Sequence, residues 1–471
     1  MVSANVLRSG TFLSSSSVGA LSHENSSGYV GLSYELLSRV SAKVGDRIRL
    51  ELQRPEGQEI VEGLLMPRYW TRKEENYLVL KLPSGYNVGV RVDSATKVSM
   101  LGKGQAPQFI RPPSPAQKPN LPKVSIVSTG GTIASKVDYR TGAVKPALDA
   151  EDLYSVVPEL ADLADIQANV LFGLFSENIG PQEWTKIAEY VADQARNGAD
   201  GVVIAHGTDT LAYTAAALSF AFTVLPIPVV LVGSQRSSDR PSSDAASNLI
   251  AATSVAGLAP FAEVVVAMHD WISDEKIAVH RGTKVRKCHT SRRDAFRSVN
   301  VKPIAYYDLV HRTLELDGGR HGPRRKGSTP VLQPQFDPNV ALIKFHPGIS
   351  AGIIDWATAA GCKGLILEGT GLGHVGDAVF SSIERAVNNG VVVGMSSQCI
   401  WGRVHMNVYS TGRDLLRIGV LPLGDMLAET ALVKMMWAFG HEKDPENVKK
   451  IMLTDVANEY SDRRELEELI Q

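Results

Sequence analysis

Two segments of the sequence place threonine hydroxyls beside glycine or aspartate. The first, residues 129–135, reads TGGTIAS and presents Thr132 after a pair of glycines. The second, residues 206–210, reads HGTDT and holds Thr208 beside Asp209. A hydroxyl with a nearby base can attack a carbonyl carbon, and a carboxylate can bind an ammonium group. The pattern therefore suggests nucleophilic or proton-relay chemistry.

Each segment alone also fits a structural role. The first can be an ordinary turn between a strand and a helix, capped by threonine. In the second, Thr208 or Asp209 can cap a helix that begins near Leu211. Residues 129–135 lack the GxxxxGK[ST] spacing of a phosphate-binding loop, which disfavours nucleotide binding there.

Both segments directly follow apolar runs that are typical of buried strands. From Lys123 onward a strand, a Gly/Ser/Thr turn and a helix alternate several times, in the runs KVSIVS, GVVIAH, PVVLVG and EVVVAM. This alternation predicts a mainly parallel sheet with helices on both faces, whose ligand crevice lies beyond the carboxyl ends of the strands. The helix beginning near Pro181 is predicted to bury one face against the sheet: Trp184, Ile187, Ala188, Val191 and Ala195.

The chain is too long for one ordinary hydrophobic core, and the pattern of apolar and polar residues changes several times along the sequence. The fold class expected is two unequal α/β domains with a mainly parallel sheet, preceded by a small all-β, barrel-like domain. The predicted parts are a disordered leader 1–32, the β domain 33–101, a Pro-rich linker 102–122, a larger α/β domain 123–325, a smaller α/β domain 326–445 and a helical tail 446–471.

Composition excludes some classes of function. The formal net charge of −1 gives no overall signature of nucleic-acid or membrane binding. The three cysteines, Cys288, Cys362 and Cys399, lack metal-ligand spacing, so neither a zinc site nor a disulfide framework is expected. No apolar run is long enough for a membrane span. We therefore expect a cytoplasmic protein without a metal or cofactor of its own.

Taken together, four motifs resemble the bacterial-type asparaginase/glutaminase family in order and spacing. They are TGGTIAS, HGTDTLAYTAAAL, VGSQRSSDRPSSDAASNL and KCHTSRRDAF, and the resemblance runs from about residue 123 to residue 438. It implies that Thr132 is the first nucleophile and that Thr208 and Asp209 are catalytic. The family lysine lies nine residues before a phenylalanine, which selects Lys287 because Lys284 misses that spacing from Phe296.

The same resemblance implies how substrate is held. A family serine followed by an acidic or amide residue binds the α-carboxylate and α-amine of the substrate, and LFSENIG offers Ser176 and Glu177. Ser176 can alternatively cap a turn. The family also has a lid tyrosine ten or more residues after the nucleophile, whereas Tyr139 is closer to Thr132. A catalytic role for Tyr139 is therefore not assigned.

About 120 residues precede the first motif, and the β module, the linker and the segments VDYRTGAVKP and RGTKVRKCHTSRRDAFRS resemble the D subunits of archaeal Glu-tRNA(Gln) amidotransferases. That resemblance implies a homodimer within a heterotetramer. It also implies that glutamine is hydrolysed, with asparagine an alternative amide donor, and that ammonia passes to an E subunit that uses ATP and Mg and holds the tRNA. Two alternatives stay open, a free-standing asparaginase and a catalytically silent amino-acid-binding protein.

Overall fold

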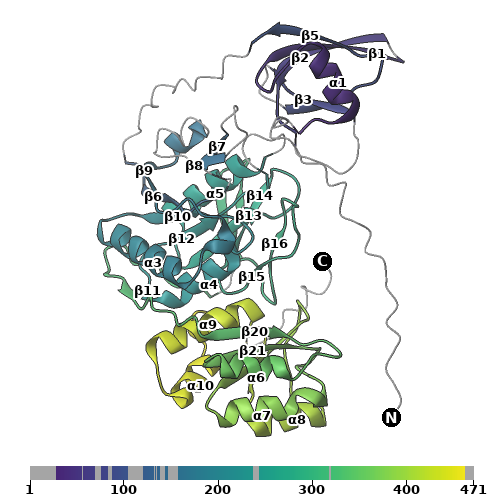
Figure 1. Cartoon of the computed structure of the whole chain (residues 1–471). Coiled ribbons are helices and arrows are strands. Elements are labelled where there is room, and N and C mark those ends of the chain that lie inside the picture. Colours follow the sequence, from purple (N-terminus) through teal and green to yellow (C-terminus); the bar gives the residue numbers. More distant parts are fainter. Residues whose placement is uncertain are drawn as a thin grey trace, which may run out of the picture. The chain divides into compact units, whose positions relative to one another are not determined.

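The computed structural model of the chain (Figure 1) describes residues 28–55, 57–68, 76–82, 87–103, 120–131, 133, 135–137, 144–146, 157–236, 243–317 and 320–461. The described residues up to 103 belong to one compact unit, and those from 120 onward belong to a second. Residues 1–27 of the predicted leader, most of the predicted linker, Thr132 and Tyr139 lie outside the described residues.

The first unit contains a five-stranded antiparallel sheet in the order β4-β3-β2-β1-β5. Its elements are α1 (Gly31–Arg39), β1 (Arg47–Arg54), β2 (Gly57–Leu65), β3 (Tyr77–Lys81), β4 (Asn87–Arg91) and β5 (Lys97–Gly102). All five strands lie within the predicted β domain, residues 33–101, apart from the last residue of β5. Alternate residues of β1, namely Ile48, Leu50 and Leu52, are buried, as expected for a sheet with one covered face.

The antiparallel sheet of this unit is preceded by a helix that the sequence did not predict. Helix α1 buries Leu36 and Leu37 in the same core as β1. Tyr29, which the predicted leader included, is fully buried, and its hydroxyl donates to Met66 O at 2.7 Å while accepting from Val79 N at 3.0 Å. Because these contacts fix residue 29, the unit begins before residue 33.

The second unit begins with an eight-stranded sheet in the order β18-β17-β14-β13-β12-β10-β6-β9. Its strands are β6 (Lys123–Ser128), β9 (Asp165–Val170), β10 (Gly201–Ala205), β12 (Val229–Val232), β13 (Val264–His269), β14 (Lys276–Arg281), β17 (Ala305–Asp308) and β18 (Thr313–Leu316). Strands β9, β6, β10, β12 and β13 are mutually parallel, and β14, β17 and β18 continue the sheet antiparallel. The sheet is therefore mainly parallel, as predicted.

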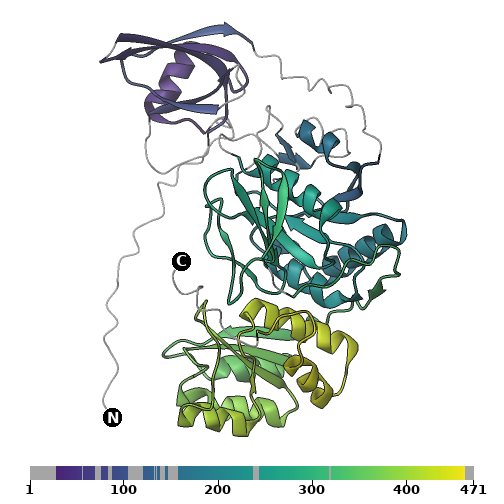
Figure 2. The same ribbon diagram turned by 180° about the vertical axis from the view of Figure 1, so that it is seen from behind.

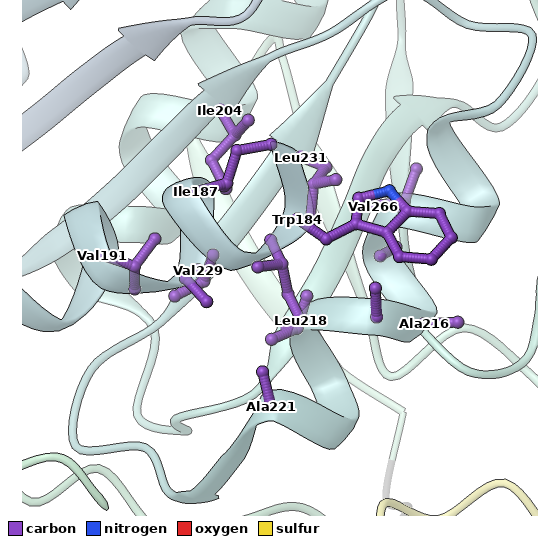
Figure 3. Packing of buried hydrophobic residues seen from close by; sticks show 14 of the residues in the cluster. Trp184, Ile187, Val191, Ile204, Ala216, Leu218, Ala221, Val229, Leu231 and Val266 are labelled. Atoms are coloured by element: carbon purple, nitrogen blue, oxygen red, sulfur yellow. The ribbon is translucent and has the colours of Figure 1, made fainter. Parts of the chain in front are cut away.

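Helices cover both faces of this sheet: α3 (Pro181–Arg196), α4 (Leu211–Ala221) and α5 (Ala245–Leu258). Successive residues of each central strand point to opposite faces, so that Ile204 packs under α3 and α4 while Val203 packs under α5. Figure 3 shows Trp184, Ile187 and Val191 of α3 together with Leu218 of α4 over the strand residues. Four residues of the predicted face of α3 are buried, and the fifth, Ala195, is partly buried against the same core. Figure 2 shows the sheet from behind.

Several short elements complete the larger α/β domain. They are β7 (Ser135–Val137), β8 (Val144–Pro146), η1 (Pro158–Asp162), η2 (Ser176–Asn178), β11 (Phe222–Val224), β15 (Val285–Lys287), β16 (Phe296–Ser298) and β19 (Val331–Leu332). Strand β15 pairs only with β16 among the described strands, in an antiparallel hairpin. Strand β19 pairs with β11, so residues 331–332 belong to the larger domain and the predicted boundary at 326 comes too early.

The smaller domain is a four-stranded parallel sheet in the order β20-β21-β22-β23. Its elements are β20 (Val340–Lys344), α6 (Gly352–Ala359), β21 (Gly364–Gly369), η3 (Asp377–Val379), α7 (Phe380–Asn388), β22 (Val392–Ser397), α8 (Ser410–Ile418), β23 (Leu421–Pro422), α9 (Ala428–His441) and α10 (Pro445–Leu453). Helices α6, α7 and α8 cover one face, while α9 and α10 cover the other (Figure 1).

The predicted helical tail is largely part of this smaller domain. Val448 and Met452 of α10 are fully buried against α9. Beyond α10 the chain is not helical up to residue 461, and the buried Glu459 carboxylate pairs there with the buried ammonium of Lys434 on α9. These contacts hold the C-terminal segment, residues 454–461, against the domain; residues 462–471 lie outside the described range.

Candidate active site

The two threonine-bearing loops meet at the carboxyl edge of the larger sheet. Strands β6 and β10 are adjacent and parallel, so residues 129–131 and 206–210 leave the sheet side by side. Gly131 has a φ of 80°, and a Cβ atom there would lie only 2.7 Å from the backbone nitrogen of Gly207. Only glycine allows this approach. Thr132, the next residue in the sequence, lies outside the described residues.

Lys287 reaches this edge from the β15–β16 hairpin. Its Nζ atom donates hydrogen bonds to Thr208 Oγ1 at 2.8 Å and to Asp209 Oδ1 at 2.7 Å. The Lys287 side chain is 13% exposed, whereas that of Asp209 is 72% exposed. The structure therefore brings together three of the four predicted catalytic residues, with an amine beside a hydroxyl and an accessible carboxylate.

The competing lysine lies in a different environment. The Lys284 side chain is fully buried, and its Nζ atom lies 2.8 Å from Asp425 Oδ2 in the segment just before α9. Burial lowers the pKa of Lys284, while the adjacent Asp425 carboxylate raises it. Because Lys284 is committed to this ion pair, the geometry favours the lysine selected by the spacing to Phe296.

Ser176 lies against the second threonine loop, whereas Glu177 is exposed to solvent. Ser176 is buried in η2, and a Cβ atom on Gly207 would lie 3.0 Å from Ser176 Oγ. Thr210 Oγ1 donates to the carbonyl oxygen of Ser176, which ties η2 to the loop. Of the two predicted substrate-binding residues, the structure brings Ser176 to the loop, whereas the Glu177 side chain is exposed.

His206, a buried histidine to which the sequence motifs assigned no role, supports the same loop. His206 Nδ1 lies 2.7 Å from Gly207 O and Nε2 lies 2.9 Å from Thr214 Oγ1. Trp184 Nε1 donates to that hydroxyl at 3.2 Å. Burial lowers the pKa of His206 to about 4, so the ring is neutral near pH 7 and donates from Nδ1. The HGT tripeptide was the only signal of this support in the sequence.

A second polar network holds the loop after β12 next to Thr208. A Cβ atom on Gly233 would lie 2.7 Å from the Thr208 methyl group. Asn248 Nδ2 donates to Gly233 O at 3.0 Å, and Asn248 Oδ1 lies 2.7 Å from Nδ1 of the buried His269. Asn248 therefore fixes the backbone at Gly233, next to Thr208. The sequence did not reveal this role, because a buried asparagine in a helix has no distinctive spacing.

No group of three or more His, Cys, Asp or Glu side chains in the described ranges is arranged to hold a metal ion. Likewise, no helix among these residues is long and apolar enough to cross a membrane.

Family models match three parts of the chain. The model "GatD N-terminal domain" matches residues 42–101. The model "Asparaginase, N-terminal" matches residues 123–317, and the model "Glutaminase/Asparaginase C-terminal domain" matches residues 339–452. The three matches follow one another in the order of the β unit, the larger α/β domain and the smaller α/β domain.

Solved structures resemble the two α/β domains. The thermostable L-asparaginase from Thermococcus kodakarensis matches with a TM-score of 0.64 and 36% identity, covering 72% of this chain and 100% of its own. L-asparaginase I from Vibrio cholerae matches with a TM-score of 0.63 and 28% identity, covering 72% of this chain and 99% of its own. The asparaginase-like fold is therefore confirmed.

Full-length relatives include the β unit as well. The D subunit of the glutamyl-tRNA(Gln) amidotransferase from Metallosphaera sedula is 50% identical over 441 residues, which cover 93% of this chain and 98% of the relative. The protein of the same name from Pyrococcus abyssi is 48% identical over 430 residues, covering 91% of this chain and 97% of the relative. The chain belongs to the family of glutamyl-tRNA(Gln) amidotransferase D subunits.

Proposed function

We propose that the chain is the glutaminase subunit of an amidotransferase that converts Glu-tRNA(Gln) to Gln-tRNA(Gln), releasing ammonia from glutamine for that reaction. Family membership supports this purpose. The observation that carries the chemistry is the position of Lys287 Nζ, within hydrogen-bond distance of both Thr208 Oγ1 and Asp209 Oδ1. An amine, a hydroxyl and a carboxylate in this arrangement can take up and pass on a proton.

The proposed first step is attack by the Thr132 hydroxyl on the side-chain amide carbon of glutamine. A threonine hydroxyl is a weak nucleophile near neutral pH and needs a base. In its neutral form, Lys287 would accept a proton through the Thr208 hydroxyl, along the 2.8 Å contact. Asp209 would hold the resulting ammonium at 2.7 Å. The proton removed from Thr132 thus stays within the site.

Collapse of the tetrahedral intermediate then breaks the carbon–nitrogen bond. The proton held by Lys287 returns to the leaving nitrogen, ammonia departs, and a γ-glutamyl ester on Thr132 remains for water to hydrolyse. The oxyanion of each tetrahedral intermediate needs donors such as backbone N–H groups. The glycine-rich loops that meet at Gly131 and Gly207 supply peptide groups at this edge without bulky side chains.

Substrate binding is assigned to the residues beside this apparatus. We assign Ser176 to the α-carboxylate of glutamine, because its hydroxyl is packed against Gly207. Glu177 is assigned to the α-ammonium group, since it is acidic and exposed in the same short helix. The accessible carboxylate of Asp209 is a second site for that ammonium.

The partner assignments extend the same proposal. We infer a homodimer that binds an E-type subunit, which would use ATP and Mg to activate Glu-tRNA(Gln) and would hold most of the tRNA. The chain itself is expected to need no cofactor and to act in the cytoplasm, where aminoacyl-tRNA is made. The first unit, with its family match over residues 42–101, separates this chain from the asparaginases that cover only its α/β domains.

The test is ammonia release from glutamine by the complex of this chain with its partner and Glu-tRNA(Gln). Lys287→Met should abolish release while leaving the fold intact. Lys363→Met is the matched control, because Lys363 forms a comparable 2.6 Å ion pair with Asp337 in the smaller domain. Equal activity of Lys287→Met and wild type would refute the assigned chemistry.

The same assay separates the alternatives. Rapid asparagine hydrolysis by the isolated chain, unaffected by partner and tRNA, would favour a free-standing asparaginase. Binding of glutamine without turnover under every condition would favour an amino-acid-binding protein.

A further inference from the structure

The strand that carries Lys287 is too short to hold its own position. Strand β15 spans three residues and pairs only with the three residues of β16 among the described strands. An isolated two-stranded hairpin of this size is marginal in water, so packing against other elements must fix it. The reach of Lys287 to Thr208 therefore depends on what the rest of the hairpin contacts.

The side chains of β15 point alternately to two different domains. Val285 lies in the core of the larger domain, and Lys287 points the same way, to Thr208 and Asp209. Arg286 points to the smaller domain, where its Nε atom lies 3.4 Å from Glu429 Oε1 in the first turn of α9. The opposite orientation of neighbouring residues is the normal consequence of strand geometry.

The residues just before β15 are bound to the smaller domain as well. Lys284 forms its buried ion pair with Asp425, just before α9. Thr430 Oγ1 of α9 donates to Thr283 O at 3.0 Å, and Thr283 Oγ1 donates to Ala457 O at 3.0 Å. Residues 283 and 284 thus attach the hairpin to the start of α9 and the C-terminal segment.

Glu429 is held as a buried partner for Arg286. Its side chain is 8% exposed, compared with 30% for Arg286. Burial raises the pKa of Glu429, and so does Glu368, while Arg286 lowers it and favours the ionised form. A partly buried ion pair is a poor source of net stability but joins two elements at a defined point, which suits a positioning role.

We propose that Glu429 and Asp425 of the smaller domain are positioning residues. By binding Arg286 and Lys284, they hold Lys287 within hydrogen-bond distance of Thr208. The inference rests on the proposed function, since it assigns these residues to the reaction in which Lys287 takes part. Neither carboxylate contacts Thr208 or Asp209, so their effect is exerted through the hairpin. Loss of the Arg286–Glu429 pair removes one of the contacts that fix β15, and a misplacement of about 1 Å can lower a rate about 100-fold.

The test compares Glu429→Gln, Arg286→Met and Arg286→Lys in the full complex, with glutamine as substrate. Glu429→Gln and Arg286→Met should lower kcat for ammonia release between roughly tenfold and 100-fold, with KM for glutamine within about twofold of wild type. Arg286→Lys, which keeps the charge, should recover part of the lost kcat. Arg286→Met serves as the variant that folds, because the Glu429 carboxyl it leaves can take up a proton.

The split between kcat and KM, and the partial recovery of kcat in Arg286→Lys, are readouts that a purely structural role would not change.

The control is Asp200→Asn, which removes a similarly buried carboxylate paired with Arg324 at 3.2 Å at the opposite, amino end of β10. It should lower the unfolding temperature and leave kcat unchanged. Folded Glu429→Gln and Arg286→Met with wild-type kcat would overturn the inference, as would an equal fall of kcat in Asp200→Asn. Absence of ammonia release by wild type would refute the proposed function and the inference with it, so the two failures are distinguishable.

Discussion

Arg286 and Lys287 are consecutive residues whose side chains bind opposite domains, Arg286 at 3.4 Å from Glu429 and Lys287 at 2.7 Å from Asp209. The pair makes β15 the link between the smaller domain and the loop that bears Thr208. Mutations at the site and mutations at its supports should therefore have separable effects on rate, substrate affinity and stability.

Thr208→Val should lower kcat for ammonia release by about 10²- to 10⁴-fold, because the hydroxyl that accepts from Lys287 is replaced by a methyl group of similar size. KM and the unfolding temperature should change little.

The control is Thr253→Val: Thr253 is 1% exposed, and its hydroxyl has no hydrogen-bond partner among the described residues. That variant should keep full activity and gain about 1 kcal/mol of stability. Wild-type kcat in Thr208→Val would exclude Thr208 from the proton relay.

Gly131→Ala should abolish most activity, because the added Cβ would lie 2.7 Å from the backbone nitrogen of Gly207 and force the two loops apart. Gly198→Ala is the matched control, since Gly198 has a comparable φ of 84° with no atom within 4 Å of the added Cβ. Both variants should lose about 1 kcal/mol or more of stability from the left-handed backbone, and only Gly131→Ala should lose kcat. Similar activity in the two would show that the loop contact is not required.

Ser176→Ala should raise KM for glutamine by roughly tenfold, the cost of one hydrogen bond to a charged group, and should affect kcat less. Ser219→Ala removes a serine hydroxyl that donates to Ala215 O within α4, and should leave KM unchanged. Steady-state ammonia assays over a range of glutamine concentrations check both. An unchanged KM in Ser176→Ala would withdraw the assignment of Ser176 to the substrate.

Stability should fall as pH is lowered from about 6.5 to 4. Burial lowers the pKa of His206 to about 4 and that of His280 to about 3. In this window the unfolded chain binds protons that the folded chain does not, so the unfolding free energy decreases with decreasing pH, by about 3 kcal/mol for each histidine at most. Thermal unfolding between pH 7 and pH 4.5 measures the trend. The unfolding temperature of His280→Gln should depend less steeply on pH than that of wild type. Equal slopes would show that His280 does not contribute to the pH dependence.

The sequence predicted the parts of the site that lie directly after long apolar strands. Thr208 and Asp209 follow β10, and Lys287 was selected by its distance from Phe296; the structure brings the three within hydrogen-bond reach. The larger sheet and the helix face of α3 were predicted because burial imposes clear periods of two and 3.6 residues on such segments.

The sequence could not predict features that depend on contacts between distant segments. Helix α1 has only nine residues and weak periodicity, so its burial against β1 decides its conformation. Strand β19 consists of two residues, too few for any pattern, and exists because β11 pairs with it. The partners Glu429 and Asp425 lie more than a hundred residues after the hairpin that they contact, and nothing in local sequence joins them.

Because the hairpin bearing Lys287 is attached to α9 and the C-terminal segment, we expect the larger domain alone to be inactive. A fragment that ends after β18 would keep every predicted catalytic residue, from Thr132 to Lys287, and yet lack Asp425, Glu429 and Thr430. Lys284, which is fully buried in the whole chain, would then have no carboxylate to neutralise it. The smaller domain thus supplies supporting contacts for the catalytic residues of the larger domain. The two domains should therefore be expressed and engineered as a single unit.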